Sequence, residues 1–402
     1  MITNNITNAL LGSIEQKAPQ VAPENIEAYL ATISKAENDL EKIDPAIAQL
    51  NKGPADSEVL AMVAAHQKQV VQSMVSSNPE DAIALTLAAS IEAYSKQLED
   101  IQAWTEGGSA VLEPMLDMIY QSILADGVDG TEYEDLMQLL VMDLLLNADA
   151  WGLNLSDLLG PDYEVYFAQI TEHFGSGLHY PYGQIGNHPP EEVIGWFLGT
   201  VITQLTPYVG NKIPVDSLTG QIVTFFNEPA NKSGLEDCAD NYFTDPNGFI
   251  NGSDDVERNG YQFVDIDASE CERLSPTLKI FVLAEAAENG QVSAEDWENF
   301  LTGDIEDAEE ILGLSDGGVG QYLCDMDEWT PEWGPFPDYS GSNGIYPDDL
   351  IATLEHFPGR ELTDEELEEV NRIGDQVKML QQTLKYWLQI CRDEQMAIAR
   401  NI

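Results

Sequence analysis

The sequence predicts a mainly α-helical protein, with long amphipathic, coiled-coil-like helices at both ends that bracket a helical, loop-rich acidic middle domain. Three observations support this fold class. Apolar residues recur at helical spacing near both ends, acidic residues concentrate between them, and strand-like alternation is rare enough to leave at most a small β element. The chain has 402 residues, and 43% of them are hydrophobic, which is enough for a sizeable core. We therefore expect three regions, at 1–105, 106–362 and 363–402.

The N-terminal region is expected to form three helices. Apolar residues recur every seven positions, and a second set follows three places later, as in the a/d seam of a coiled coil. The two sets are Ile26, Ile33, Leu40, Ile47 and Tyr29, Ala36, Ile43, Leu50. Pro45 interrupts this seam. A second helix is predicted after the capping residues Asp56 and Ser57, and a third near Pro79, which suits the first turn.

The C-terminal region carries the clearest helical pattern in the chain. Thr363 and Glu366 have the spacing of a capping box, which marks a helix start. Apolar residues then alternate in steps of three and four, at Val370, Ile373, Val377, Leu380, Leu384, Trp387 and Cys391, and the stripe continues to Ile398. A helix with such a face must bury it, most commonly on the core of its own domain and otherwise on another chain.

The middle region carries almost all of the negative charge. The whole chain has 17 basic and 71 acidic residues, a net charge of -54, and residues 106–369 hold 6 of the basic and 54 of the acidic ones, net -48. Helices are predicted here at Val111–Leu124, Tyr133–Leu146, Tyr163–Phe174, Pro190–Leu205, Pro276–Ala287, Ala294–Leu301 and Asp348–Phe357. Strands are predicted only at Gln221–Phe226 and Tyr261–Ile266.

This charge bears on the class of partner and on location. A strongly negative surface repels nucleic acid and anionic lipid, and it favours basic proteins, cations or a saline medium that screens self-repulsion. No stretch reaches the roughly 18 consecutive apolar residues expected of a membrane span. The N-terminus lacks the basic start and apolar run of a signal peptide. We therefore expect synthesis in the cytoplasm, with export without cleavage or incorporation into a virion or other particle left open.

One loop in the middle region is a candidate cation site. Within the stretch 243–254, Asp245, Asn247, Asn251 and Asp254 occupy positions three, five, nine and twelve of an EF-hand-like loop. Position one, normally aspartate, is Phe243, so the loop lacks its first ligand. The sequence thus offers Ca²⁺ binding at these four residues, and an Asx-rich surface turn is the alternative interpretation.

Two further clusters raise other chemistry. His173, His179 and His188 lie within sixteen residues, but their spacing matches no zinc pair on one helix face. Acidic residues also surround two tryptophans, a combination seen at sugar-cleaving sites, although so acidic a chain produces such neighbours by chance. These residues are Asp325, Asp327, Glu328 and Glu332, with Trp329 and Trp333. The four cysteines are widely spaced, and a Cys238–Cys271 disulfide remains open.

The terminal helix at Leu367–Ile402 and the bracketing layout together resemble the hydrophilic needle-tip and filament proteins of type III secretion systems. The resemblance implies an acidic protein without a cleaved signal, whose long C-terminal helix drives assembly. A phage or viral particle component has the same features. We therefore expect a non-enzymatic structural protein that forms a homo-oligomer or larger assembly and has a basic protein as a possible partner. The alternatives are a carboxylate-based hydrolase in the middle domain and a calcium-binding or salt-adapted protein.

Overall fold

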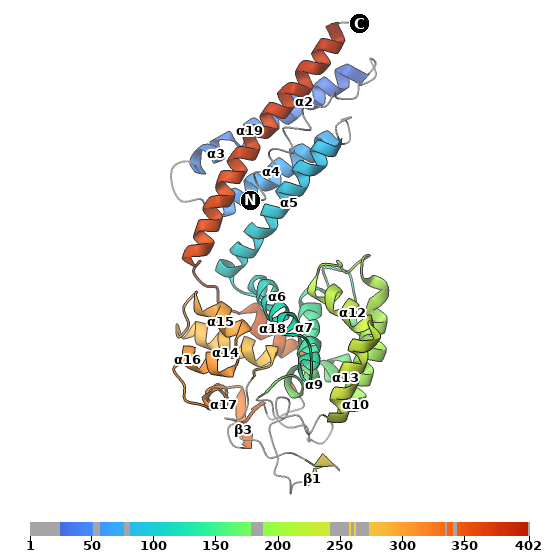
Figure 1. Cartoon of the computed structure of the whole chain (residues 1–402), viewed down its shortest axis with the longest axis vertical. Coiled ribbons are helices and arrows are strands. Elements are labelled where there is room, and N and C mark those ends of the chain that lie inside the picture. The colour runs from blue at the N-terminus through green and yellow to red at the C-terminus, as the bar shows by residue number, and fades with distance from the viewer. Residues whose placement is uncertain are drawn as a thin grey trace. The chain divides into compact units, whose positions relative to one another are not determined.

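The computed structural model describes residues 25–50, 57–75, 81–177, 188–241, 257–258, 261–262, 273–333, 336–340 and 344–400. These residues are mainly helical, with two small antiparallel sheets of two strands each, so the predicted fold class is confirmed. The chain divides into two compact units (Figure 1). The helical unit comprises Met1–Thr105 and Glu361–Ile402, and the acidic unit comprises Glu106–Arg360. Within the described residues, no helix combines the length and apolar composition needed to cross a membrane.

The described helices of the helical unit come from both ends of the chain. They are α2 (Ile26–Glu41), α3 (Asp44–Leu50), α4 (Ser57–Val75), α5 (Asp81–Glu106) and α19 (Asp364–Arg400). Pro45 separates α2 from α3 and lies in the first turn of α3, where its missing N–H costs no helical hydrogen bond. α19 contacts both α2 and α4 and runs alongside α2 (Figure 1). The C-terminal helix therefore packs on the N-terminal helices of its own chain.

The apolar stripe of α19 is buried in the core of the helical unit. It supplies eight core side chains, Val370, Ile373, Val377, Leu380, Leu384, Trp387, Leu388 and Cys391. The facing seam of α2 includes Ile33 and Leu40, both of which are fully buried. The predicted capping box is present, because Thr363 Oγ1 accepts from Glu366 N at 3.2 Å and Glu366 Oε2 accepts from Thr363 N at 2.9 Å.

A buried layer of polar side chains fixes the register of these helices. Tyr94 Oη donates to Gln67 Oε1 at 2.7 Å, and Gln67 Nε2 donates to the backbone oxygen of Val377 at 3.1 Å. Gln381 Nε2 in turn donates to the backbone oxygen of Leu40 at 3.0 Å. Sliding α19 along its neighbours would leave these buried groups without hydrogen-bond partners. An unpaired buried polar group costs more free energy than an intact hydrogen bond contributes to stability.

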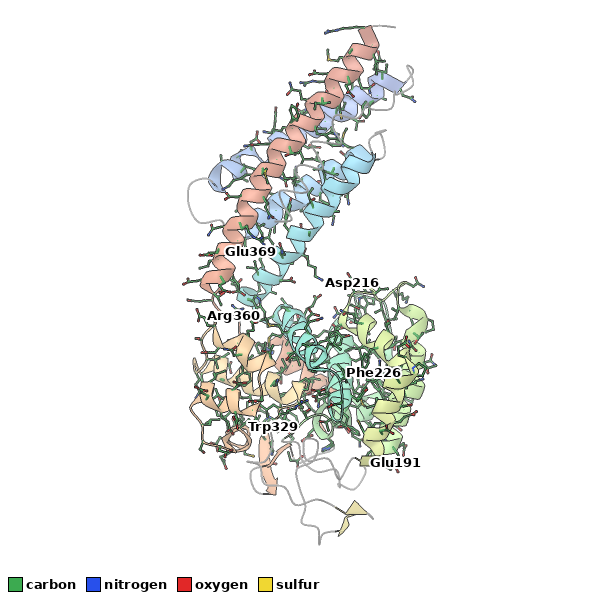
Figure 2. All side chains as sticks on the ribbon, viewed as in Figure 1. Glu191, Asp216, Phe226, Trp329, Arg360 and Glu369 are labelled. Atoms are coloured by element: carbon green, nitrogen blue, oxygen red, sulfur yellow. The ribbon has the colours of Figure 1, made fainter. Side chains whose placement is uncertain are left out.

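The acidic unit is an assembly of short helices. They are α6 (Ser109–Asp126), α7 (Glu132–Asn147), α8 (Leu155–Leu159), α9 (Tyr163–His173), α10 (Pro190–Trp196), η2 (Phe197–Ile202), α11 (Thr203–Leu205), η3 (Thr206–Tyr208), α12 (Leu218–Asn227), α13 (Pro229–Asn241), α14 (Pro276–Glu288), α15 (Asp296–Thr302), α16 (Ile305–Leu312), α17 (Gly318–Cys324) and α18 (Pro347–Glu355). β1 (Glu257–Arg258) pairs with β2 (Tyr261–Gln262), and β3 (Trp329–Trp333) pairs with β4 (Phe336–Tyr339). Phe226 is buried inside this unit, whereas Glu191 and Asp216 lie at its surface (Figure 2).

One predicted strand is wrong. Gln221–Phe226 lies within helix α12, whose buried residues Ile222, Val223 and Phe226 share one helical face. Ser217 caps this helix by accepting from Gly220 N. Of the other predicted strand, Tyr261–Gln262 forms β2, and the rest lies outside the described residues.

Polar side chains of α7 organise the centre of the acidic unit. Asp143 accepts from the N–H of Thr219 at 2.8 Å, and Gln138 Oε1 accepts from the N–H of Thr277 at 3.0 Å. These bonds cap the first turns of α12 and α14 from a distant part of the chain. Asp135 accepts from the N–H of Ser176 at 2.7 Å, and burial raises its pKa to about 6. Asp135 and Asp143 therefore stabilise the fold of this unit by accepting buried hydrogen bonds.

Candidate functional site

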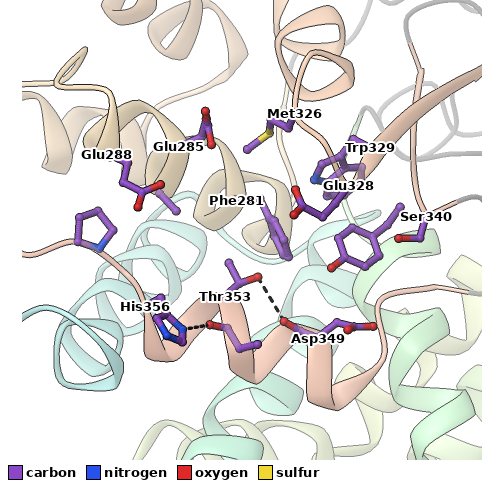
Figure 3. A pocket seen from close by; sticks show the side chains of 14 residues that line it. Phe281, Glu285, Glu288, Met326, Glu328, Trp329, Ser340, Asp349, Thr353 and His356 are labelled. Atoms are coloured by element: carbon purple, nitrogen blue, oxygen red, sulfur yellow. Dashed lines mark hydrogen bonds between the residues drawn. The ribbon is translucent and has the colours of Figure 1, made fainter.

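A pocket with a volume of about 550 Å³ opens in the acidic unit between α14, α18 and the β3–β4 hairpin (Figure 3). Two helix faces form its walls. Phe281, Ala284, Glu285 and Glu288 of α14 follow the spacing i, i+3, i+4, i+7, which places them on one side of that helix. Asp349, Ala352 and Thr353 of α18, together with His356 directly after its end, repeat this spacing. Each helix therefore presents a continuous face to the pocket.

Three buried aromatic rings lie together in the lining. Trp329 and Tyr339 are paired across β3 and β4, and their ring centroids are 5.3 Å apart. Phe281 packs edge-to-face on both, at 5.4 Å from Trp329 and 5.8 Å from Tyr339. This is the preferred geometry for aromatic contacts. The strand register and α14 together place this cluster, which has Met326 beside it in the lining.

Four carboxylates complete the lining, namely Glu285, Glu288, Glu328 and Asp349. The described residues that line the pocket include no lysine or arginine. Within the described part of the chain, none of these four carboxylates forms an ion pair. Burial, together with the charges of Asp349 and Glu328, raises the pKa of Tyr339 to about 12. The pocket therefore combines apolar rings with uncompensated negative charge.

The hydrogen bonds of His356 and Glu285 show which of their polar atoms are already bonded within the protein. Nδ1 of His356 lies 2.7 Å from the backbone oxygen of Ala352, so this nitrogen carries the proton and donates it. Nε2 of His356 is then the nitrogen that this bond leaves available. Glu285 Oε1 accepts from Asn289 Nδ2 at 2.7 Å, which orients the Glu285 carboxylate from outside the pocket.

A buried carboxyl pair holds the β3–β4 hairpin in place. Glu172 of α9 accepts from the N–H of Tyr339 at 2.5 Å, and both Glu172 and Asp338 are buried. Burial and the neighbouring Asp338 raise the pKa of Glu172 well above its usual value. Protonated Glu172 can therefore lie against Asp338 without a second buried charge. The pair anchors the strand that carries Tyr339 into the pocket lining.

The residues predicted for calcium binding, Asp245, Asn247, Asn251 and Asp254, lie outside the described residues. Calcium binding there therefore stays a prediction. Cys271 also lies outside them, and the described Cys238 places its Sγ 3.0 Å from the backbone oxygen of Gly130. The Cys238–Cys271 disulfide is likewise untested.

The described histidines of the stretch 173–188 lie in different surroundings. His173 is fully buried on α9, whereas His188 stacks on Tyr166 at 4.3 Å and lies 3.0 Å from Glu192 Oε1. His179 lies outside the described residues. Across the described ranges, no group of three or more His, Cys, Asp or Glu side chains has the arrangement to hold a metal ion.

The acidic cluster around two tryptophans is divided by the structure. Glu328 and Trp329 line the pocket, whereas Asp325 accepts from Gln321 Nε2 at 2.9 Å in an exposed contact. The side chains of Glu332 and Trp333 are outside the described part of the chain. Sequence reasoning missed Phe281, Glu285, Tyr339 and Asp349, which join the site from three other elements. The local signal for Phe281, Glu285 and Asp349 is the repeated i, i+3, i+4, i+7 spacing on α14 and α18, which does not extend to Tyr339 on β4.

Comparison of the chain with protein-family models, with curated proteins and with solved structures found no match.

Proposed function

We propose that this protein is a non-enzymatic assembly protein that acts through contacts with other proteins, as a subunit of a secreted or particle-type assembly. The observation that carries the proposal is the unequal charge of the two units. The acidic unit has 6 basic and 48 acidic residues, net -42, whereas the helical unit has 11 basic and 23 acidic residues, net -12. The negative charge of the acidic unit attracts a basic partner. Self-association through the helical unit meets less electrostatic repulsion, because that unit carries less net charge.

The pocket supports a binding role for the acidic unit. Asp135 and Asp143 are buried and accept hydrogen bonds inside the unit, whereas the carboxylates of Glu328 and Asp349 line a cavity. Negative groups without a basic neighbour make the electrostatic potential inside a concave site strongly negative. A cationic group of a partner would gain from that potential on entering.

The outer face of α19 supports a second contact surface. Met379 and Tyr386 each lie two residues beyond a buried core residue, Val377 and Leu384, which places them roughly 200° around the helix from the seam. They are 43% and 54% exposed. Their spacing of two helical turns aligns both on one face, which suits packing against a second copy of this chain.

Light scattering after size-exclusion chromatography tests this proposal over a wide range of protein and salt concentration. The mass should rise above that of the monomer, and the double change Met379→Ala with Tyr386→Ala should prevent the rise. The matched control replaces Met62, which is 54% exposed on α4, with alanine. A monodisperse monomer under every condition would contradict the assembly proposal.

A carboxylate-based hydrolase is the second candidate, because Glu328 and Trp329 lie in the same pocket as Asp349. Hydrolysis of chromogenic glycosides tests it. Turnover that Glu328→Gln abolishes, without a change in thermal unfolding, would favour the enzyme over the assembly protein.

A further inference from the structure

We infer that the pocket between α14, α18 and the β3–β4 hairpin is a binding site for an ammonium-tipped alkyl chain, the chemistry of a lysine side chain on a basic partner. This inference rests on the proposed function and names the ligand chemistry of its acidic unit. It is drawn from three properties of the pocket: its apolar surface, its charge and the distribution of its carboxylates over several elements.

The apolar surface accounts for the alkyl part of the ligand. Phe281, Trp329 and Tyr339 form one packed aromatic cluster in the lining, and Met326 adds a thioether beside it. A lysine stem is a chain of four methylenes, and each of them gains free energy when it is removed from water. A cavity of about 550 Å³ lies within the usual range of small-molecule sites and readily admits such a chain.

The charge of the lining accounts for the ammonium tip. Glu285 and Glu288 lie on α14, Glu328 precedes β3, and Asp349 lies on α18. No lysine or arginine accompanies them among the described lining residues. An ammonium group has three donors on a rotatable stem, so it can bond carboxylates that come from different directions.

The distribution of the carboxylates argues against a bare metal ion as the ligand. Calcium requires six to eight oxygen ligands at about 2.3–2.6 Å, which demands convergent carboxylates. No such convergence of three or more acidic, histidine or cysteine side chains occurs in the ranges that the structure describes. In the close-up, Glu285 and Glu288 lie on α14, on one side of the pocket, and Asp349 lies on α18, on the other side (Figure 3). A ligand with an extended body suits this layout better than a point charge.

Isothermal titration of the full chain with n-hexylammonium tests the inference, with 1-hexanol as the neutral probe of the same length. Hexylammonium should bind roughly tenfold more tightly than hexanol, given ordinary values for partly exposed ion pairs. Glu285→Gln with Glu328→Gln should weaken hexylammonium by a similar factor and leave hexanol within twofold. Gln keeps the acceptor that Asn289 requires, so the fold is preserved.

Two controls separate the pocket from the general charge of the acidic unit. Glu295→Gln with Glu298→Gln removes the same charge from exposed positions outside the lining and should change hexylammonium binding less than twofold. Ala352→Phe fills the pocket from an exposed helical position without any change in charge, and it should weaken both probes.

Three results would overturn the inference: equal affinity for the two probes, an equal loss in the charge control, or displacement of hexylammonium by equimolar Ca²⁺. Hexylammonium binding by a protein that never assembles would remove the proposed function and leave the site intact. Assembly without hexylammonium binding would remove the proposed site and leave the assembly function intact.

Discussion

Removal of α19 should unfold the rest of the helical unit and leave the acidic unit folded. The helix supplies eight buried apolar side chains to a core shared with α2 and α4. At about 1.5–3 kcal/mol for each side chain, their burial contributes roughly 12–24 kcal/mol as an upper estimate. This contribution is as large as, or larger than, the net free energy of unfolding of an ordinary domain, which is about 5–15 kcal/mol. A chain that ends at Leu362 should therefore lose protection throughout the described residues 25–50, 57–75 and 81–105.

Hydrogen exchange read by mass spectrometry resolves the two units separately. Peptides from α4 and α5 should exchange fast in the truncated chain, while peptides from α7 and α14 keep the protection seen in the full chain. The double change Met379→Ala with Tyr386→Ala is the control, because both side chains are exposed on the same helix and neither belongs to the core. Undiminished protection of α4 and α5 after truncation would refute the reasoning.

Three further predictions concern the acidic unit. Gln138→Leu should cost about 3 kcal/mol or more in urea unfolding, because the N–H and hydroxyl of Thr277 lose their acceptor; a cost below about 1 kcal/mol would contradict this. Asp135 has its folded pKa raised to about 6 from 3.8, so its contribution to stability is present below pH 3.8 and is lost as pH rises to about 6. The loss should be about 3 kcal/mol, and Asp135→Asn should remove this slope from urea unfolding measured across that range; an unchanged slope would count against it. Glu172 has its folded pKa raised well above 4.5, so stability should also fall as pH rises from 4.5 through the folded value. Glu172→Gln should flatten that fall, and the same pH series would show an unaltered fall if the carboxyl pair did not share a proton.

The end helices could be predicted from sequence because local and global signals agree there. In α19, the capping box at Thr363 and the three–four alternation from Val370 specify the same start and the same buried face. The prediction of a strand within α12 was wrong because Gln221–Phe226 is rich in β-branched and aromatic residues, which favour strands locally. Its helical state draws on the Asp143 carboxylate, which caps it from 76 residues away in the chain. No local pattern contains that information.

The pocket could be predicted only in part for a similar reason. Glu328 and Trp329 are neighbours in sequence, so their cluster is visible there, but Phe281 and Asp349 reach it through tertiary packing. The β3–β4 hairpin that brings in Tyr339 was not predicted. Its two strands each contain a proline, Pro331 and Pro337, and proline argues against a strand because it cannot donate to the ladder. The register that pairs Trp329 with Tyr339 is therefore known only from the structure.

Methyl NMR of methionine-labelled protein tests the central claim most directly, because Met326 lines the pocket whereas Met62 is 54% exposed on α4 of the helical unit. Titration with n-hexylammonium should shift the Met326 methyl signal in a saturable way and leave the Met62 signal in place. Glu285→Gln with Glu328→Gln should weaken that saturation. An unmoved Met326 signal, or equal shifts at Met326 and Met62, would contradict a cation-binding pocket in the acidic unit.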